Sequence, residues 1–172
     1  MSEASSVIAE RIEEAEKWAS RAGELLVAMQ KGVGGLRSKG EIDFVTAADL
    51  EAQNIILAGV RETFDGDGFL FEEEDCHLPG QTGYQWVVDP LDGTTNYLHG
   101  STHYAVSIGL IYQGEPVGGV IHAPAYGEMF TARRGHGAYL NGASIHVSDT
   151  DNLAHALLAT GFPYDRRERL DT

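Results

Sequence analysis

The chain has 172 residues, which is the length of one domain and enough to bury a hydrophobic core. Its 26 Asp and Glu residues against 12 Lys and Arg residues give a formal net charge of −14, which disfavours nonspecific nucleic-acid binding and favours metal cations as partners. The single cysteine excludes an internal disulfide and a multi-cysteine zinc site, and no apolar run could span a membrane, so a cytoplasmic location is expected.

The N-terminal segment has the pattern of an amphipathic helix. Its apolar residues recur at three- and four-residue spacing, with charged residues between them: Ile8, Ile12, Ala15, Ala19, Ala22, Leu26 and Met29. The glycine-rich stretch 31–41 that follows predicts a flexible loop. Its glycines do not follow a strand and lack the rest of a dinucleotide-binding fingerprint, so no dinucleotide site is expected there.

A second helix is predicted to begin near Thr46. Thr46 and Asp49 have the spacing of a capping box, with Asp in the place of the usual Glu or Gln. The apolar stripe of this helix consists of Ala52, Ile55, Ile56, Val60 and Phe64. At this point, helix capping and a chemical role explain Asp49 equally well.

Beyond Gly68 the sequence changes to short runs rich in Val, Ile and aromatic residues, which are typical of strands. These runs are 69–71, 85–89, 104–112, 117–123 and 128–134. In 104–112, small residues alternate with large apolar ones, as in a half-buried strand. Two helices followed by strands predict an α+β fold, with two long helices packed on an antiparallel sheet.

Acidic residues stand at the ends of two of these runs and form the candidate site. Glu72 follows the first run. Asp89 ends the second, where Pro90 is predicted to stop the regular strand, and Asp92 follows three residues later. If both strands end on the same side of the sheet, the three carboxylates converge and repel one another unless cations lie among them. Oxygen ligands of this kind favour Mg²⁺ or Mn²⁺.

A predicted helix N-terminus follows these carboxylates. The backbone N–H groups of Gly93, Thr94 and Thr95 would face an anion such as phosphate. Carboxylates, metal ions and a phosphate site together indicate metal-assisted phosphoryl transfer. Each part also has a plainer explanation, because an acidic run is commonly a solvated face and Asp89 could cap this helix. Capping, however, needs one carboxylate rather than three.

Five segments together carry a likeness to one enzyme family. They are DFVTAAD (43–49), FEEED (71–75), WVVDPLDGTTNYLHG (86–100), FTARRGHGAYLNG (130–142) and ATGFPYD (159–165). They resemble the inositol monophosphatase family of Mg²⁺-dependent, lithium-sensitive phosphatases. The resemblance implies that residues 1–172 form the N-terminal, metal-binding half of the layered sugar-phosphatase fold, with the C-terminal α/β domain absent from this chain. It also implies hydrolysis of a small phosphate monoester, first of all myo-inositol 1-phosphate.

The resemblance implies which residues hold the metal ions. The ligands of two Mg²⁺ ions would be three carboxylates and one backbone carbonyl: Glu72, Asp89, Leu91 and Asp92. Glu73 resembles a second acidic residue that supports a more weakly bound ion, and it is the alternative to Glu72 as the direct ligand. Mn²⁺ could replace Mg²⁺, and Li⁺ would inhibit.

The resemblance also implies the catalytic residues, the partners and two alternatives. Asp49 and Thr94 would orient the attacking water and take its proton, while residues 93–95 hold the phosphate. A homodimer with no direct nucleic-acid or membrane partner is expected, and the 172-residue chain is expected to turn over substrate poorly alone. One alternative is a related phosphatase, such as fructose-1,6-bisphosphatase or histidinol phosphatase. The other is a regulatory protein that retains the metal site and acts through a transcription-linked partner.

Overall fold

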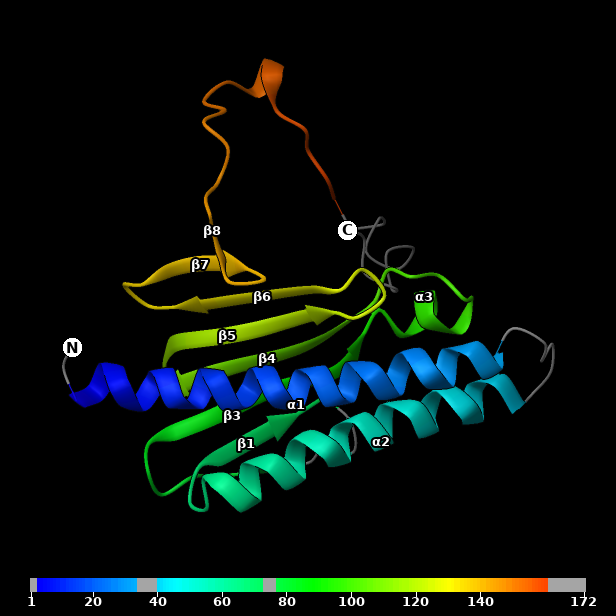
Figure 1. Cartoon of the computed structure of the whole chain (residues 1–172), viewed down its shortest axis with the longest axis horizontal. Helices are drawn as coiled ribbons and strands as arrows, with labels where there is room; N and C mark the ends of the chain where they lie inside the picture. Colours follow the sequence, from blue (N-terminus) through cyan, green and yellow to red (C-terminus); the bar gives the residue numbers. More distant parts are fainter. Residues whose placement is uncertain (1–2, 34–39, 73–76, 161–172) are drawn as a thin grey trace, which may run out of the picture.

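Two long helices lie along one face of a sheet in the computed structural model, which describes residues 3–33, 40–72 and 77–160 (Figure 1). The helices are α1 (Glu3–Val33) and α2 (Gly40–Thr63), and they pack against each other. The sheet has eight strands, so the predicted α+β class is confirmed. None of the described helices is long and apolar enough to cross a membrane.

The sheet has the strand order β2-β1-β3-β4-β5-β6-β7-β8. Its strands are β1 (Gly68–Phe71), β2 (His77–Leu78), β3 (Tyr84–Asp92), β4 (Ala105–Tyr112), β5 (Glu115–Ala123), β6 (Glu128–Arg133), β7 (Gly137–Leu140) and β8 (Ala143–Ile145). Every neighbouring pair is antiparallel except β1 and β3, which are parallel. The five predicted strands are therefore confirmed, whereas β2, β7 and β8 were missed because they are too short to show a periodic pattern.

The second helix begins earlier than the sequence predicted. Because α2 starts at Gly40, Thr46 lies within the helix, and its spacing to Asp49 is not an N-terminal capping box. The apolar spacing of the helix continues upstream through Ile42 and Val45, and this periodic signal is stronger than one capping pair. Asp49 is buried, with 4% of its surface exposed. Capping therefore no longer explains this carboxylate.

The end of β3 also differs from the prediction. The strand does not stop at Asp89 but continues through Pro90 to Asp92. Its register with β4 shifts on the way, since Asp89 lies opposite Ser107 and Asp92 opposite Ala105. Such a bulge accommodates a proline, which has no N–H to donate to the ladder.

The hydrophobic core fills the space between the helices and the sheet. The predicted α1 stripe supplies Ile12, Ala15, Ala19, Ala22 and Leu26, all of which are buried. Small residues let α1 approach the sheet closely, and a Cβ at Gly23 would come within 2.5 Å of the His122 imidazole on β5. On β4 the residues alternate between buried and half-buried, as predicted for a half-buried strand.

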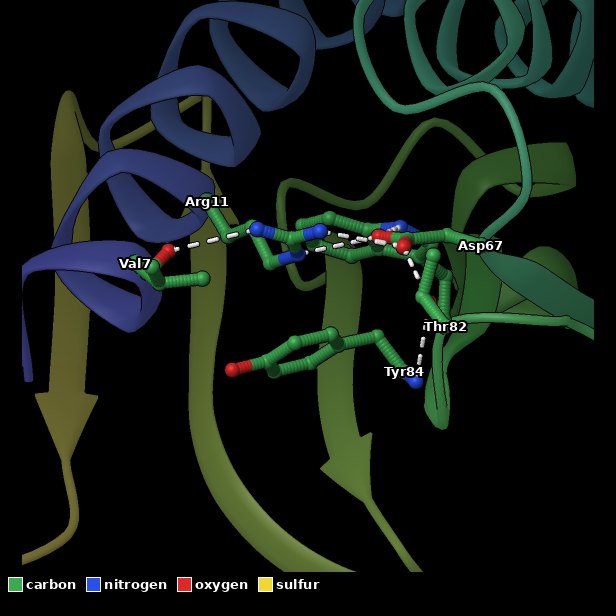
Figure 2. Close-up of polar contacts among 6 residues, drawn as sticks. Val7, Arg11, Asp67, Thr82 and Tyr84 are labelled. Atoms are coloured by element: carbon green, nitrogen blue, oxygen red, sulfur yellow. Dashed lines mark hydrogen bonds and ion pairs between the residues drawn. The ribbon is translucent and has the colours of Figure 1, made fainter. Parts of the chain in front are cut away.

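A buried ion pair ties α1 to the chain just before β1 (Figure 2). Arg11 donates from Nε and Nη2 to the two carboxylate oxygens of Asp67, at 2.9 and 3.0 Å. The Asp67 side chain is fully buried, and it also accepts hydrogen bonds from the Thr82 hydroxyl at 2.6 Å and the Trp86 indole at 3.2 Å. These contacts fix the start of β1, and the other end of β1 leads directly into Glu72.

Candidate active site

A pocket of about 430 Å³ opens where β1 and β3 end. Its lining comes from the ends of these strands and from the short helix α3 (Thr94–Leu98), and consists of Glu72, Asp89, Leu91, Asp92, Gly93, Thr94, Thr95 and Asn96. All of these except Asn96 were predicted site residues. Asn96 was missed although it adjoins the predicted phosphate-binding residues, because an exposed asparagine carries no chemical signal of its own.

The parallel pairing of β1 and β3 brings the first two carboxylates together. Phe71 lies opposite Val88 in the register, and the Glu72 N–H donates to the Val88 carbonyl at 3.0 Å. Both strands therefore end on the same side of the sheet, which is the condition on which the predicted convergence depended. Glu72 is thereby placed beside Asp89.

The electrostatics of Asp89 reflect this crowding. Burial first, then a hydrogen bond with Glu72 and the charges of Glu72 and Asp92, together raise the pKa of the Asp89 carboxyl to about 7. A hydrogen bond between two carboxyl groups requires a proton on one of them. In the absence of a cation, a proton therefore offsets the repulsion that a metal ion would otherwise relieve.

The carboxylates do not by themselves complete a metal centre. Across residues 3–33, 40–72 and 77–160, no three His, Cys, Asp or Glu side chains form a group that could hold a metal ion. A bound cation would therefore need further oxygen ligands, such as a backbone carbonyl, water or phosphate. Ligation by Glu72, Asp89 and Asp92 together stays a prediction.

The backbone of Leu91 is held from both sides in the turn between Asp89 and α3. Its N–H donates to Asp89 Oδ1 at 3.1 Å, and its carbonyl accepts a hydrogen bond from Thr94 Oγ1, also at 3.1 Å. The Leu91 side chain is buried. A buried anchor thus fixes a carbonyl oxygen within the pocket, and that oxygen has a second lone pair to offer.

Gly93 makes the sharp entry into α3. It has a φ of 94°, in the left-handed region, and a Cβ there would lie 2.8 Å from the His103 carbonyl oxygen. Both the conformation and the close approach require glycine. The helix begins at Thr94, as predicted, so the first N–H groups of α3 have no partner within the helix.

One predicted residue does not line this pocket, and another lies outside the described residues. Asp49 lies on α2, which contacts α3, but it is not among the residues that line the pocket. Its role with Thr94 stays a prediction. Glu73 lies outside the described residues, so its choice as an alternative to Glu72 is not tested.

Comparison with known proteins adds an independent finding. The model of the inositol monophosphatase family matches residues 4–172. An inositol-1-monophosphatase of Rhizobium meliloti is 44% identical over 127 residues, covering 73% of this chain and 47% of that protein. The Nus factor SuhB of Salmonella typhimurium is 39% identical over 134 residues, covering 78% of this chain and 50% of that protein.

Solved structures of proteins with similar names also resemble this chain. An inositol monophosphatase from Anabaena (Nostoc) sp. superposes with a TM-score of 0.81 and 39% identity, covering 94% of this chain and 58% of that one. The SuhB of Mycobacterium tuberculosis superposes with a TM-score of 0.78 and 30% identity, covering 95% of this chain and 63% of that one. The chain spans about half the length of the curated relatives it matches.

Proposed function

Since the chain belongs to the inositol monophosphatase family, we propose that it carries the metal-binding and phosphate-binding part of a phosphatase that hydrolyses a small phosphate monoester. The observation that carries this proposal is the forced pairing of Glu72 with Asp89 in a pocket that also contains Asp92 and Thr94. Crowded carboxylates are costly without a counter-charge, and a divalent cation supplies one. The residues present therefore fit a metal ion with oxygen ligands.

The proposed ligands of Mg²⁺ are the carboxylates and the carbonyl at the ends of β1 and β3: Glu72, Asp89, Leu91 and Asp92. When bound, Mg²⁺ would acidify a water molecule and neutralise charge on the phosphate. Mn²⁺ has the same preference for oxygen ligands and is proposed as a substitute, and Li⁺ as an inhibitor.

The proposed catalytic work of the chain's own residues centres on Thr94. Its hydroxyl already donates its hydrogen to the Leu91 carbonyl, so its oxygen lone pairs are oriented to accept a hydrogen bond from an attacking water. As the water gives its proton to the Thr94 oxygen, the Thr94 hydroxyl hydrogen would turn from the Leu91 carbonyl to Asp49, which is proposed as the acceptor because it is the buried acid on the helix that packs against α3. The N–H groups at 93–95 would hold the phosphate oxygens.

The proposed substrate is myo-inositol 1-phosphate. Support comes from the name of the Rhizobium meliloti relative, an inositol-1-monophosphatase that is 44% identical to this chain. Because the chain spans about half of that relative's length, turnover by a whole protein is part of the proposal. Fructose 1,6-bisphosphate and histidinol phosphate are the substrates to compare.

The experiment is a phosphate-release assay over five or six monoesters, with and without Mg²⁺, on the chain extended to the length of its relatives. We expect release that requires Mg²⁺, is fastest with inositol 1-phosphate and is abolished by Asp92→Asn. Release that continues without a divalent cation, or that survives Asp92→Asn, would contradict the proposed site.

A second candidate function rests on a different observation. Several relatives are named Nus factor SuhB, among them the Salmonella typhimurium protein and one from Pseudomonas aeruginosa that is 41% identical over 150 residues. We propose as the alternative that the chain acts through a transcription-linked protein partner. A stable complex whose transcriptional output is unchanged by Asp92→Asn would favour this alternative, whereas output lost together with phosphatase activity would favour the enzyme.

A further inference from the structure

The helix α3, which forms one wall of the pocket, is too short to hold its own position. It spans only Thr94–Leu98, and a single turn of helix is unstable by itself in water. Its placement must therefore come from contacts with the rest of the fold. Those contacts decide where Thr94 and its neighbours stand relative to the carboxylates on β1 and β3.

The first contact comes from Tyr97, whose side chain is completely buried. Its hydroxyl donates to the Leu26 carbonyl of α1 at 2.7 Å, and its ring packs edge-on against Tyr104, with centroids 4.9 Å apart. Burial raises the pKa of the Tyr97 hydroxyl, so the proton that it donates stays in place. Tyr97 thus links the middle of α3 to the backbone of α1.

The second contact comes from Gln30, one helical turn beyond Leu26 on the same face of α1. Its Nε2 donates to the Ser101 carbonyl at 2.9 Å and to the Tyr97 carbonyl at 3.3 Å. A glutamine amide has two N–H groups, and both are used here. The Tyr97 carbonyl lies in the last turn of α3 and also accepts from the Gly100 N–H at 3.0 Å, and Ser101 lies just beyond the helix.

The opposite side of α3 is held by the chain before β4. The Asn96 side-chain amide donates to the His103 carbonyl at 2.8 Å, and the close approach of Gly93 to the same carbonyl leaves no room for a Cβ. α3 therefore lies between this segment and the C-terminal part of α1. The helix α3 also contacts α2, and within the part of the chain that the structure describes its hydrogen bonds to α1 come from Gln30 and Tyr97.

We propose that Gln30 and Tyr97 are positioning residues for the pocket: through Leu26, Tyr97 and Ser101 they fix α3 to α1, so that Thr94 and the N–H groups at 93–95 face the phosphate. The proposal rests on the proposed function. Neither side chain lines the pocket, so neither is expected to contact substrate. α1 can serve as the fixed support because its Ala19, Ala22 and Leu26 are fully buried in the core.

The test uses the 172-residue chain with Gln30→Met, which keeps the length of the side chain but removes both donors, and with Tyr97→Phe, which removes only the hydroxyl. Backbone NMR measures amide exchange along the chain and the dissociation constants of Mg²⁺ and of inorganic phosphate in saturating Mg²⁺. The matched control is Gln81→Met, at an exposed position before β3, whereas the pocket lies at the far end of that strand.

We expect the Kd of phosphate to rise up to about fivefold in Tyr97→Phe, the factor of one net hydrogen bond, and by more in Gln30→Met, which removes two. Amide exchange at 94–98 should quicken by about the same factor, while exchange in β4 stays unchanged. The Kd of Mg²⁺ should stay within about twofold, because its carboxylate ligands lie at the ends of β1 and β3 rather than on α3. The control should match the wild type throughout.

Two results would overturn the proposal: a phosphate Kd that is unchanged in both variants, or exchange that quickens equally in α3 and β4. The second would mean that these contacts stabilise the whole fold rather than position α3. If the wild-type chain itself binds no phosphate, the proposed function fails. Amide exchange at 94–98 then tests the positioning role by itself. Unchanged exchange there refutes that role, and faster exchange confined to these residues supports it.

Discussion

Replacement of Arg11 by methionine tests the buried ion pair that fixes the start of β1. Asp67 has no exposed side-chain surface and receives two hydrogen bonds from the Arg11 guanidinium, so Arg11→Met would leave a buried carboxylate without its counter-charge. Removing one partner of such a pair costs about 3–5 kcal/mol of stability. The guanidinium also lies over the rings of Phe64 and Tyr84, at 4.4 and 4.0 Å from their centroids, and those contacts are lost as well.

The assay is urea unfolding of Arg11→Met and of Lys17→Met, its control on the same helix. Lys17 pairs with Glu14 at 2.7 Å, but its side chain is 65% exposed, so this pair contributes little and the control should unfold like the wild type. We expect the free energy of unfolding to fall by about 3–5 kcal/mol in Arg11→Met, with an unchanged dependence on urea. A loss below about 1 kcal/mol would show that water reaches Asp67 and that the ion pair is not a structural anchor.

Three further predictions concern the metal ions and pH. Asp92→Asn should weaken Mg²⁺ binding at least about tenfold in calorimetric titration while leaving the metal-free chain no less stable, because it relieves like-charge repulsion; unchanged affinity would remove Asp92 from the site. The melting temperature should rise with Mg²⁺ but not with Na⁺ of matched ionic strength, since saturation to a hundred times Kd stabilises the native state by about 2.7 kcal/mol, and identical melting curves would contradict a native-state metal site. Burial lowers the pKa of His122, so the unfolded chain binds a proton more readily, and stability should fall as pH drops through about 6.5. His122→Gln should flatten that slope, and an equal slope in the variant would show that another group causes it.

Much of the fold could be predicted because its signals are local. The apolar spacing of α1 and the alternation in β4 each lie within one continuous segment, and the structure confirms both. The residues at which elements begin were harder to predict, since Thr46 has the residue type of a helix cap but lies inside α2. The register shift that lets β3 pass Pro90 depends on pairing with β4, which no local pattern reveals.

The residues of the site could be predicted, but the tertiary contacts that hold them in place could not. The acidic residues at two strand ends suggested convergence, yet only the parallel pairing of β1 and β3 shows that these ends meet. Arg11 and Asp67 are 56 residues apart in sequence, and nothing in either segment indicates the other. Gln30 could not be predicted for the same reason, because its partners Tyr97 and Ser101 lie 67 and 71 residues away in sequence and meet it only in the folded chain.

The central claim is that the pocket at the ends of β1 and β3 binds a phosphate monoester together with Mg²⁺. Its most direct test is an NMR titration of the 172-residue chain with myo-inositol 1-phosphate, once in Mg²⁺ and once in EDTA. We predict saturable shifts of the amides of Glu72, Asp89 and residues 91–95 in Mg²⁺ only. Equal shifts in EDTA, or shifts that cluster away from these residues, would contradict it.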